Sequence, residues 1–147
     1  MRLQRKEDWP ELLAEFLESR RVQTFAWGEN DCALFVCDAV LAMTGTDIAE
    51  AFRGRYSTSV GAMRAMVEAG THRGLVGVAE AVTAEFEMQE VPVLMAQRGD
   101  VVLFDVSEEA GPALGVVGLH GHTAVSVGPD GAVNIPVAQC RRAWRVG

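Results

Sequence analysis

Basic residues, histidines, cysteines and long apolar runs are all scarce in this chain of 147 residues. Thirteen Lys and Arg stand against twenty Asp and Glu, which gives a formal net charge of -7. Because binding to nucleic acid rests on clustered cations, this balance argues against a nucleic-acid partner. No apolar run is long enough to span a membrane, and the polar start of the chain lacks the apolar region of a signal peptide. We therefore expect a protein made in a cytoplasm, with no membrane span.

The three cysteines are too few and too scattered for a metal site. An odd number gives no paired disulfide framework and agrees with free thiols in a reducing compartment. Cys32 and Cys37 are five residues apart, so a helix places them on different faces, and Cys140 lies far along the chain. A zinc or iron-sulfur site would lack a fourth ligand at suitable spacing. We expect no metal and no cofactor.

Residues 1–147 are predicted to form one globular domain, because the chain has no repeat, long linker or low-complexity tract and is 49% hydrophobic. Apolar spacing predicts helices near residues 9–20, 32–44, 60–69 and 75–84. Short β-branched runs separated by turn residues then predict strands near residues 91–94, 99–104, 114–117, 122–127 and 132–137. Helices followed by an antiparallel meander predict an α+β fold, in which N-terminal helices pack on a C-terminal antiparallel sheet.

Three local features refine the helix predictions. Asp8 and Glu11 have the spacing of a capping box at the start of the first helix. Gly70 is predicted to end the third helix. The methionines on these helices are predicted to fill the core: Met43, Met63 and Met66.

The segment 25–32, Phe-Ala-Trp-Gly-Glu-Asn-Asp-Cys, leads into the second helix. Asp31 is placed to cap that helix, Gly45 to end it, and Cys32 to occupy its first position. Unpaired amides and the dipole at a helix start stabilise a thiolate, so this position can lower a cysteine pKa from about 8.5 towards neutrality. Cys32 is thus a candidate nucleophile. The alternative is an ordinary buried apolar cysteine.

This segment resembles the nucleophile segment of the NlpC-type cysteine peptidases, papain-fold enzymes that cleave the peptide stems of bacterial cell walls. The shared features are an aromatic-x-Trp-Gly run, an Asp-Cys pair and an apolar helix. The Trp-Gly-x-x-Asp-Cys form in a short chain is similar to the compact NlpC-like proteins of phage and prophage tail modules. Residues 98–104, Arg-Gly-Asp-Val-Val-Leu-Phe, look like the Gly-Asp-hydrophobic strand of that family. One departure is Ala33-Leu34, where the family usually has Ser-Gly.

The resemblance implies a papain-like NlpC-type fold and a cysteine peptidase that cleaves peptidoglycan stem peptides. It also implies a chain made in the bacterial cytoplasm without a signal peptide and incorporated in a phage virion tail, with other tail-tip proteins as partners. A cell-wall peptide would be the substrate of an active site. The alternative is a catalytically inactive fold of the same type that serves as a structural or assembly component of the tail tip.

Two registers of the sheet give different sites. In the family the base begins a His-apolar-Gly-apolar strand, and the residue that orients it lies on the next strand. In the first register His122 begins that strand, and Cys32, His122 and Asn134 form the catalytic triad. In the second register residues 113–118 form that strand, so Ala113 stands where the histidine is required, and His122 merely opens the following strand. Residue chemistry favours the first register and loop lengths favour the second, so both remain open.

The remaining candidates have weaker signals. His120 is predicted at an exposed hairpin tip, where it is a poor substitute base, and His72 in a surface loop. The C-terminal residues 138–147 are either a contact element for tail neighbours or a last strand whose Trp144 covers the core.

Overall fold

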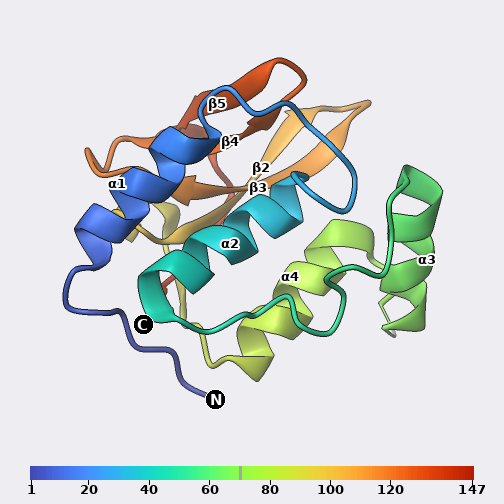
Figure 1. The fold of residues 1–147 in the computed structure, drawn as a ribbon, viewed down its shortest axis with the longest axis horizontal. Helices are drawn as coiled ribbons and strands as arrows, with labels where there is room; N and C mark the ends of the chain where they lie inside the picture. The colour runs from blue at the N-terminus through green and yellow to red at the C-terminus, as the bar shows by residue number, and fades with distance from the viewer. Residues whose placement is uncertain (70) are drawn as a thin grey trace.

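The computed structural model of the chain describes residues 1–69 and 71–147. Its first part is helical (Figure 1), and each predicted helix is present. Asp31 caps the second helix through its side chain and Gly45 ends it in the left-handed conformation, as predicted. Thr58 caps the third helix in the same way as Asp31. The helices are α1 (Trp9–Arg20), α2 (Cys32–Thr44), α3 (Ser59–Glu68) and α4 (Gly74–Glu85).

The prediction of a capping box at Asp8 is wrong. Asp8 lies at φ -96°, ψ 25° and its side chain makes no capping hydrogen bond. A side-chain cap requires extended backbone at this position, which Asp8 does not have. The predicted stop of α3 at Gly70 lies outside the described residues.

The second part of the chain is an antiparallel sheet with strand order β1-β6-β2-β3-β4-β5. The predicted α+β fold is therefore confirmed. The predicted strand near residues 91–94 is only two residues long, because Pro92 interrupts it and Val93–Met95 forms a 3-10 helix. The strands are β1 (Glu90–Val91), β2 (Val101–Ser107), β3 (Gly111–Val117), β4 (Thr123–Gly128), β5 (Gly131–Pro136) and β6 (Arg142–Trp144).

Helix α2 lies across one face of the sheet, with α1 beside it (Figure 1). Its buried side chains form one core with residues of the strands, among them Leu103 and Val116. A second buried cluster contains Val102, Phe104 and Ala113. Trp144 is 2% exposed, so the interpretation of the last strand as a cover for the core is confirmed.

Helix α3 packs on α4 and stands apart from α1 in Figure 1. Met43 on α2 is fully buried, as predicted, but Met63 on α3 is 65% exposed. The core prediction for Met63 is therefore wrong. The reason is that α3 turns the side of Ala62, which is 6% exposed, towards the rest of the molecule and leaves Met63 outside.

Asp100, just before β2, joins both ends of the chain to the sheet. Its carboxylate is fully buried and accepts hydrogen bonds from Arg5 at 2.9 Å and Arg145 at 3.3 Å. The backbone N–H groups of Gln97 and Val146 also donate to it. The aspartate of the Gly-Asp-hydrophobic strand therefore has a structural role.

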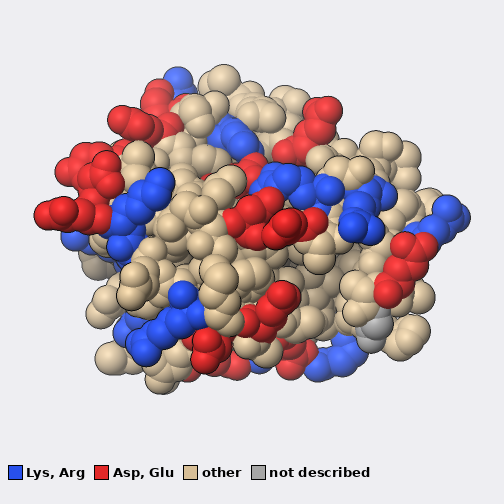
Figure 2. All heavy atoms as spheres, turned by 60° about the horizontal axis from the view of Figure 1, so that its bottom comes forward, with Lys and Arg blue, Asp and Glu red and all other residues tan. Residues whose placement is uncertain are grey.

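Acidic and basic side chains are interspersed on the face shown in Figure 2, with uncharged atoms between them. That face has no continuous basic surface of the kind that binds nucleic acid. Within residues 1–69 and 71–147, no helix has the length and apolar character needed to cross a membrane.

Candidate functional site

Asp31 holds the start of α2 in place. Its carboxylate accepts hydrogen bonds from the backbone N–H of Leu34 at 2.9 Å, the backbone N–H of Gly28 at 3.0 Å and the Tyr56 hydroxyl at 2.6 Å. Gly28 has a φ of +80°, and a Cβ there would lie 2.1 Å from the carbonyl oxygen of Tyr56. The loop before Cys32 therefore needs a glycine at this position.

Asn30 fixes the same loop from the other side. Its side-chain amide donates to the carbonyl oxygens of Gln23 and Thr24, and its oxygen accepts from Arg20 at 3.1 Å. Arg20 in turn pairs with Asp38 on α2 at 2.7 Å. The glycine, asparagine and aspartate of the Trp-Gly-x-x-Asp-Cys segment are thus all explained by loop and helix geometry.

Asp31→Asn should lower the free energy of unfolding by about 1–3 kcal/mol, because an amide has one acceptor oxygen where the carboxylate serves three donors, and buried donors without partners are costly. Urea denaturation followed by circular dichroism measures the loss. Asp130→Asn, in the exposed turn between β4 and β5, is the control and should change the free energy little. Equal stability of the two variants would contradict this role of Asp31.

Cys32 begins α2, as predicted, but the pKa of its thiol is raised and not lowered as the sequence predicted. Burial raises the pKa of the thiol from its ordinary value of 9.0 to about 11, and the Asp31 carboxylate adds to the increase. Backbone hydrogen bonds from Leu114, Ala33 and Cys32 itself act to lower the pKa and do not offset the burial. Desolvation therefore outweighs the helix start, and the thiol stays protonated at neutral pH.

The neighbouring titratable side chains do not offset the raised pKa of the Cys32 thiol. Burial, together with the hydrogen bond to Asp31, raises the pKa of Tyr56, so its phenol is neutral and acts as a donor. Burial also raises the pKa of Cys37 and of Cys140. Among the described residues that line the cleft beside Cys32 there is no histidine to take the thiol proton.

The strands follow the second register of the sheet. A short turn after Ser107 leads directly into β3, and the backbone of Leu114 in β3 is close enough to the Cys32 thiol to act on its pKa. Cys32 also packs against the buried cluster that contains Ala113. Ala113 therefore lies in the strand that directly follows β2, as the second register predicted.

The structure does not bring His122 to Cys32. Val116 pairs with Val125 and Gly118 binds Thr123, so His122 lies five ladder positions beyond the level of Leu114. At about 3.3 Å per residue this is roughly 16 Å along the sheet. The residues of the triad predicted in the first register, Cys32, His122 and Asn134, are not brought together, because His122 and Asn134 are exposed and are not among the described residues that line the cleft beside Cys32.

The other predicted residues also lie apart from the thiol. Asn134 is exposed on β5, opposite Val125. His120 is exposed in the turn between β3 and β4, and His72 is exposed before α4, both as predicted. Across residues 1–69 and 71–147, no group of three or more His, Cys, Asp or Glu side chains is placed to hold a metal ion.

A cleft of about 480 Å³ opens beside Cys32, between the start of α2 and helices α3 and α4. Apolar side chains dominate its lining, including Trp27, Tyr56 and Met66. Asp31 and Glu85 are the charged residues among the described lining residues. Sequence reasoning missed this cleft, because Tyr56 and Glu85 carry no local signal and lie far from Cys32 in the sequence.

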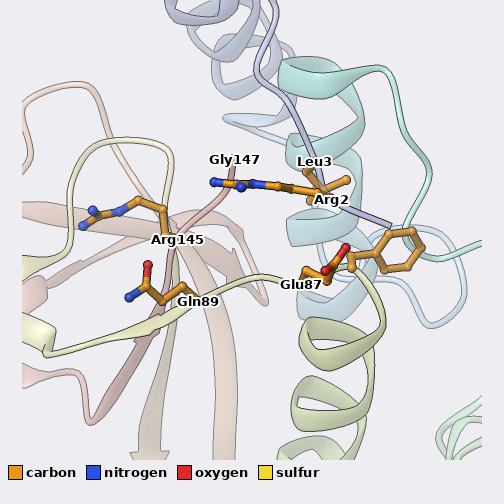
Figure 3. A pocket seen from close by; sticks show the side chains of 7 residues that line it. Arg2, Leu3, Glu87, Gln89, Arg145 and Gly147 are labelled. Atoms are coloured by element: carbon orange, nitrogen blue, oxygen red, sulfur yellow. The ribbon is translucent and has the colours of Figure 1, made fainter.

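A second hollow of about 310 Å³ lies where the two ends of the chain meet (Figure 3). Arg2 runs towards Gly147 there, and Arg145 and Gln89 approach from the sheet. Arg145 is already engaged, since it donates to Asp100 and to the Met95 carbonyl oxygen. This hollow therefore belongs to the structural junction around Asp100.

One family model matches the chain over residues 4–146, described as "Domain of unknown function (DUF6950)". The match covers almost the whole chain, so the chain belongs to this family. No curated protein matches the chain.

Proposed function

We propose that this member of the DUF6950 family is a catalytically inactive NlpC-like protein that serves as a structural or assembly component of a phage or prophage tail tip. The observation that carries the loss of catalysis is that no histidine is among the described residues that line the cleft beside Cys32, and Ala113 stands in β3 where the second register places the missing base. The partners would be other tail-tip proteins.

The chemistry of thiol hydrolases supports this proposal. Attack on a peptide carbonyl needs a thiolate, with a base within hydrogen-bonding reach to take the thiol proton and return it to the leaving amine. With a pKa of about 11, only about one Cys32 in ten thousand is ionised at pH 7. His72, His120 and His122 are exposed and lie outside the surroundings of the thiol.

The tail-tip role rests on the resemblance of the segment 25–32 and of residues 98–104 to compact NlpC-like tail proteins. The fold agrees with that resemblance, since a helix that begins at a cysteine packs on an antiparallel sheet. Cys32 also has a packing role, because its partly buried side chain packs against a buried apolar cluster.

The test uses a phage or prophage from which the gene for this chain has been deleted. Either the parent chain or Cys32→Ser is then supplied in its place. We expect the parent chain in purified tail particles, and we expect both parent and Cys32→Ser to restore particle assembly. Neither purified protein should release stem-peptide fragments from peptidoglycan. Fragments released by the parent and not by Cys32→Ser would make the chain an active peptidase, and particles that assemble without the chain would remove the tail-tip role.

A further inference from the structure

Three large apolar side chains of helix α3 are exposed to solvent. Val60, Met63 and Val67 are 63%, 65% and 53% exposed. At about 100° per residue they share one side of the helix, and we call them the α3 stripe. The adjoining side lines the cleft beside Cys32, with Ala65 and Met66 among its residues.

The α3 stripe and the cleft form one continuous apolar surface. Met66 lies about 60° from Met63 around the helix, and between them in projection lies only Ser59, which is in the first turn of α3. The charged residues of α3 occupy a narrow sector that borders the stripe: Arg64 lies about 40° from Val60 around the helix, and Glu68 lies about 40° beyond Arg64. A helix that is apolar around most of its circumference is normally buried, so α3 is suited to contact with a further molecule.

The charges of the cleft select among such molecules. The Asp31 carboxylate already accepts hydrogen bonds from three donors of the chain itself. Glu85 is exposed at the cleft, and within the described residues its carboxylate takes part in no ion pair. No Lys, Arg or His is among the described lining residues. The cleft therefore complements an apolar body that carries a positive charge, and the net charge of -7 favours the same partner at long range.

The edges of the sheet offer a weaker site. Strand β5 is one edge, but the N–H of Ala132 is bound by the Arg21 carbonyl oxygen and Pro136 has no N–H to donate. Strand β1 is the other edge, and it has only two residues before Pro92. Such edges do not accept an added strand. The cleft and the α3 stripe are thus the better-suited interaction surface.

We propose that the cleft and the α3 stripe together bind a short segment of a partner protein that presents apolar side chains next to a lysine or arginine. The apolar side chains enter the cleft between α3 and α4, and the cation pairs with Glu85. The volume of about 480 Å³ admits a few side chains rather than a folded element. This inference rests on the proposed function, since it names the chemistry by which the chain would contact its neighbours.

The test uses three amidated, N-acetylated tetrapeptides, Leu-Phe-Lys-Leu, Leu-Phe-Gln-Leu and Leu-Phe-Glu-Leu, titrated into the full chain and followed by amide chemical shifts. We expect the Lys peptide to bind about 5-fold more tightly than the Glu peptide at low salt, as one partly exposed ion pair allows. Glu85→Gln should remove that preference. Shifts should centre on residues of the cleft such as Trp27 and Met66.

Two further variants separate cleft binding from a general effect. Ala65→Phe fills the cleft and should weaken the Lys peptide at least about 10-fold, and Met63→Glu should weaken it less. Leu94→Glu is the matched control: Leu94 is 83% exposed but lies on the 3-10 helix Val93–Met95, so binding should not change. Thermal unfolding of each variant confirms that it remains folded.

Equal affinities for the Lys and Glu peptides, unchanged binding to Ala65→Phe, or no binding at all would overturn the proposal. A parent chain that dimerises in sedimentation, with the dimer lost in Met63→Glu, would show that the occupant is a second copy and would also overturn it. These results are independent of the peptidoglycan and particle assays, so failure of the binding proposal is distinguishable from failure of the proposed function.

Discussion

Asp100→Ala should lower the free energy of unfolding by about 3–5 kcal/mol, the usual cost of removing one partner of a buried ion pair. The carboxylate is fully buried and serves Arg5, Arg145 and the N–H groups of Gln97 and Val146. Without it, two guanidinium groups each lose one of their acceptors, and two backbone amides lose theirs. Urea denaturation followed by circular dichroism measures the change.

Asp105→Ala is the control for that measurement. Asp105 also pairs with an arginine, Arg141 at 3.5 Å, but both side chains are about half exposed. Exposed pairs contribute about 0–1 kcal/mol, so this variant should remain close to the parent. An Asp100→Ala chain as stable as Asp105→Ala would show that Asp100 does not hold the chain ends.

Ala113→His should raise the alkylation rate of Cys32 at pH 7.5 by about 100-fold. If position 113 is that of the missing base, as the second register predicts, an imidazole there would form a thiolate-imidazolium pair, and a decrease of about two units in the thiol pKa increases the thiolate fraction by that factor. Iodoacetamide labelling followed by mass spectrometry measures the rate at each cysteine. Cys37 and Cys140 serve as internal references.

Ala113→Asn controls for the disturbance of packing, because Ala113 is only 8% exposed and any larger side chain must displace neighbours. Asparagine is close to histidine in size and polarity but cannot accept the thiol proton. If Asn and His accelerate alkylation equally, the variants have only opened the site, and Ala113 is not the position of the missing base.

Element boundaries were predictable from the sequence where the signals are local. Asp31 caps the start of α2 through its side chain and Gly45 ends that helix through its backbone conformation. Thr58 caps the start of α3 through its side chain. Asp8 shows the limit of such patterns, because its backbone is not extended and residue type alone does not reveal this.

The register of the sheet was not predictable, because residues 113–118 and 122–127 are both short apolar runs bounded by turn residues. Only the three-dimensional pairing shows that β3 follows β2 through a short turn and passes Cys32. The direction of the Cys32 pKa shift was predicted wrongly for a related reason. The helix start is visible in the sequence, whereas the burial that outweighs it depends on strands about 80 residues away.

The exposed side of α3 and the Asp100 junction also escaped sequence reasoning. Met63 has the helical spacing of a core residue, but which side of α3 is covered depends on its packing against α4. Asp100 contacts residues 95 and 45 positions away, Arg5 and Arg145. Such long-range pairs leave no periodic pattern in the sequence.

The absence of a catalytic base beside Cys32 is tested most directly by the alkylation rate of Cys32 as a function of pH, in the parent and in His122→Ala. We expect an apparent pKa of about 11 in both proteins, with a rate that rises about tenfold per pH unit between pH 7 and 10. An apparent pKa near or below 7 in the parent that increases in His122→Ala would contradict the account, because it would show a working thiolate-imidazole pair.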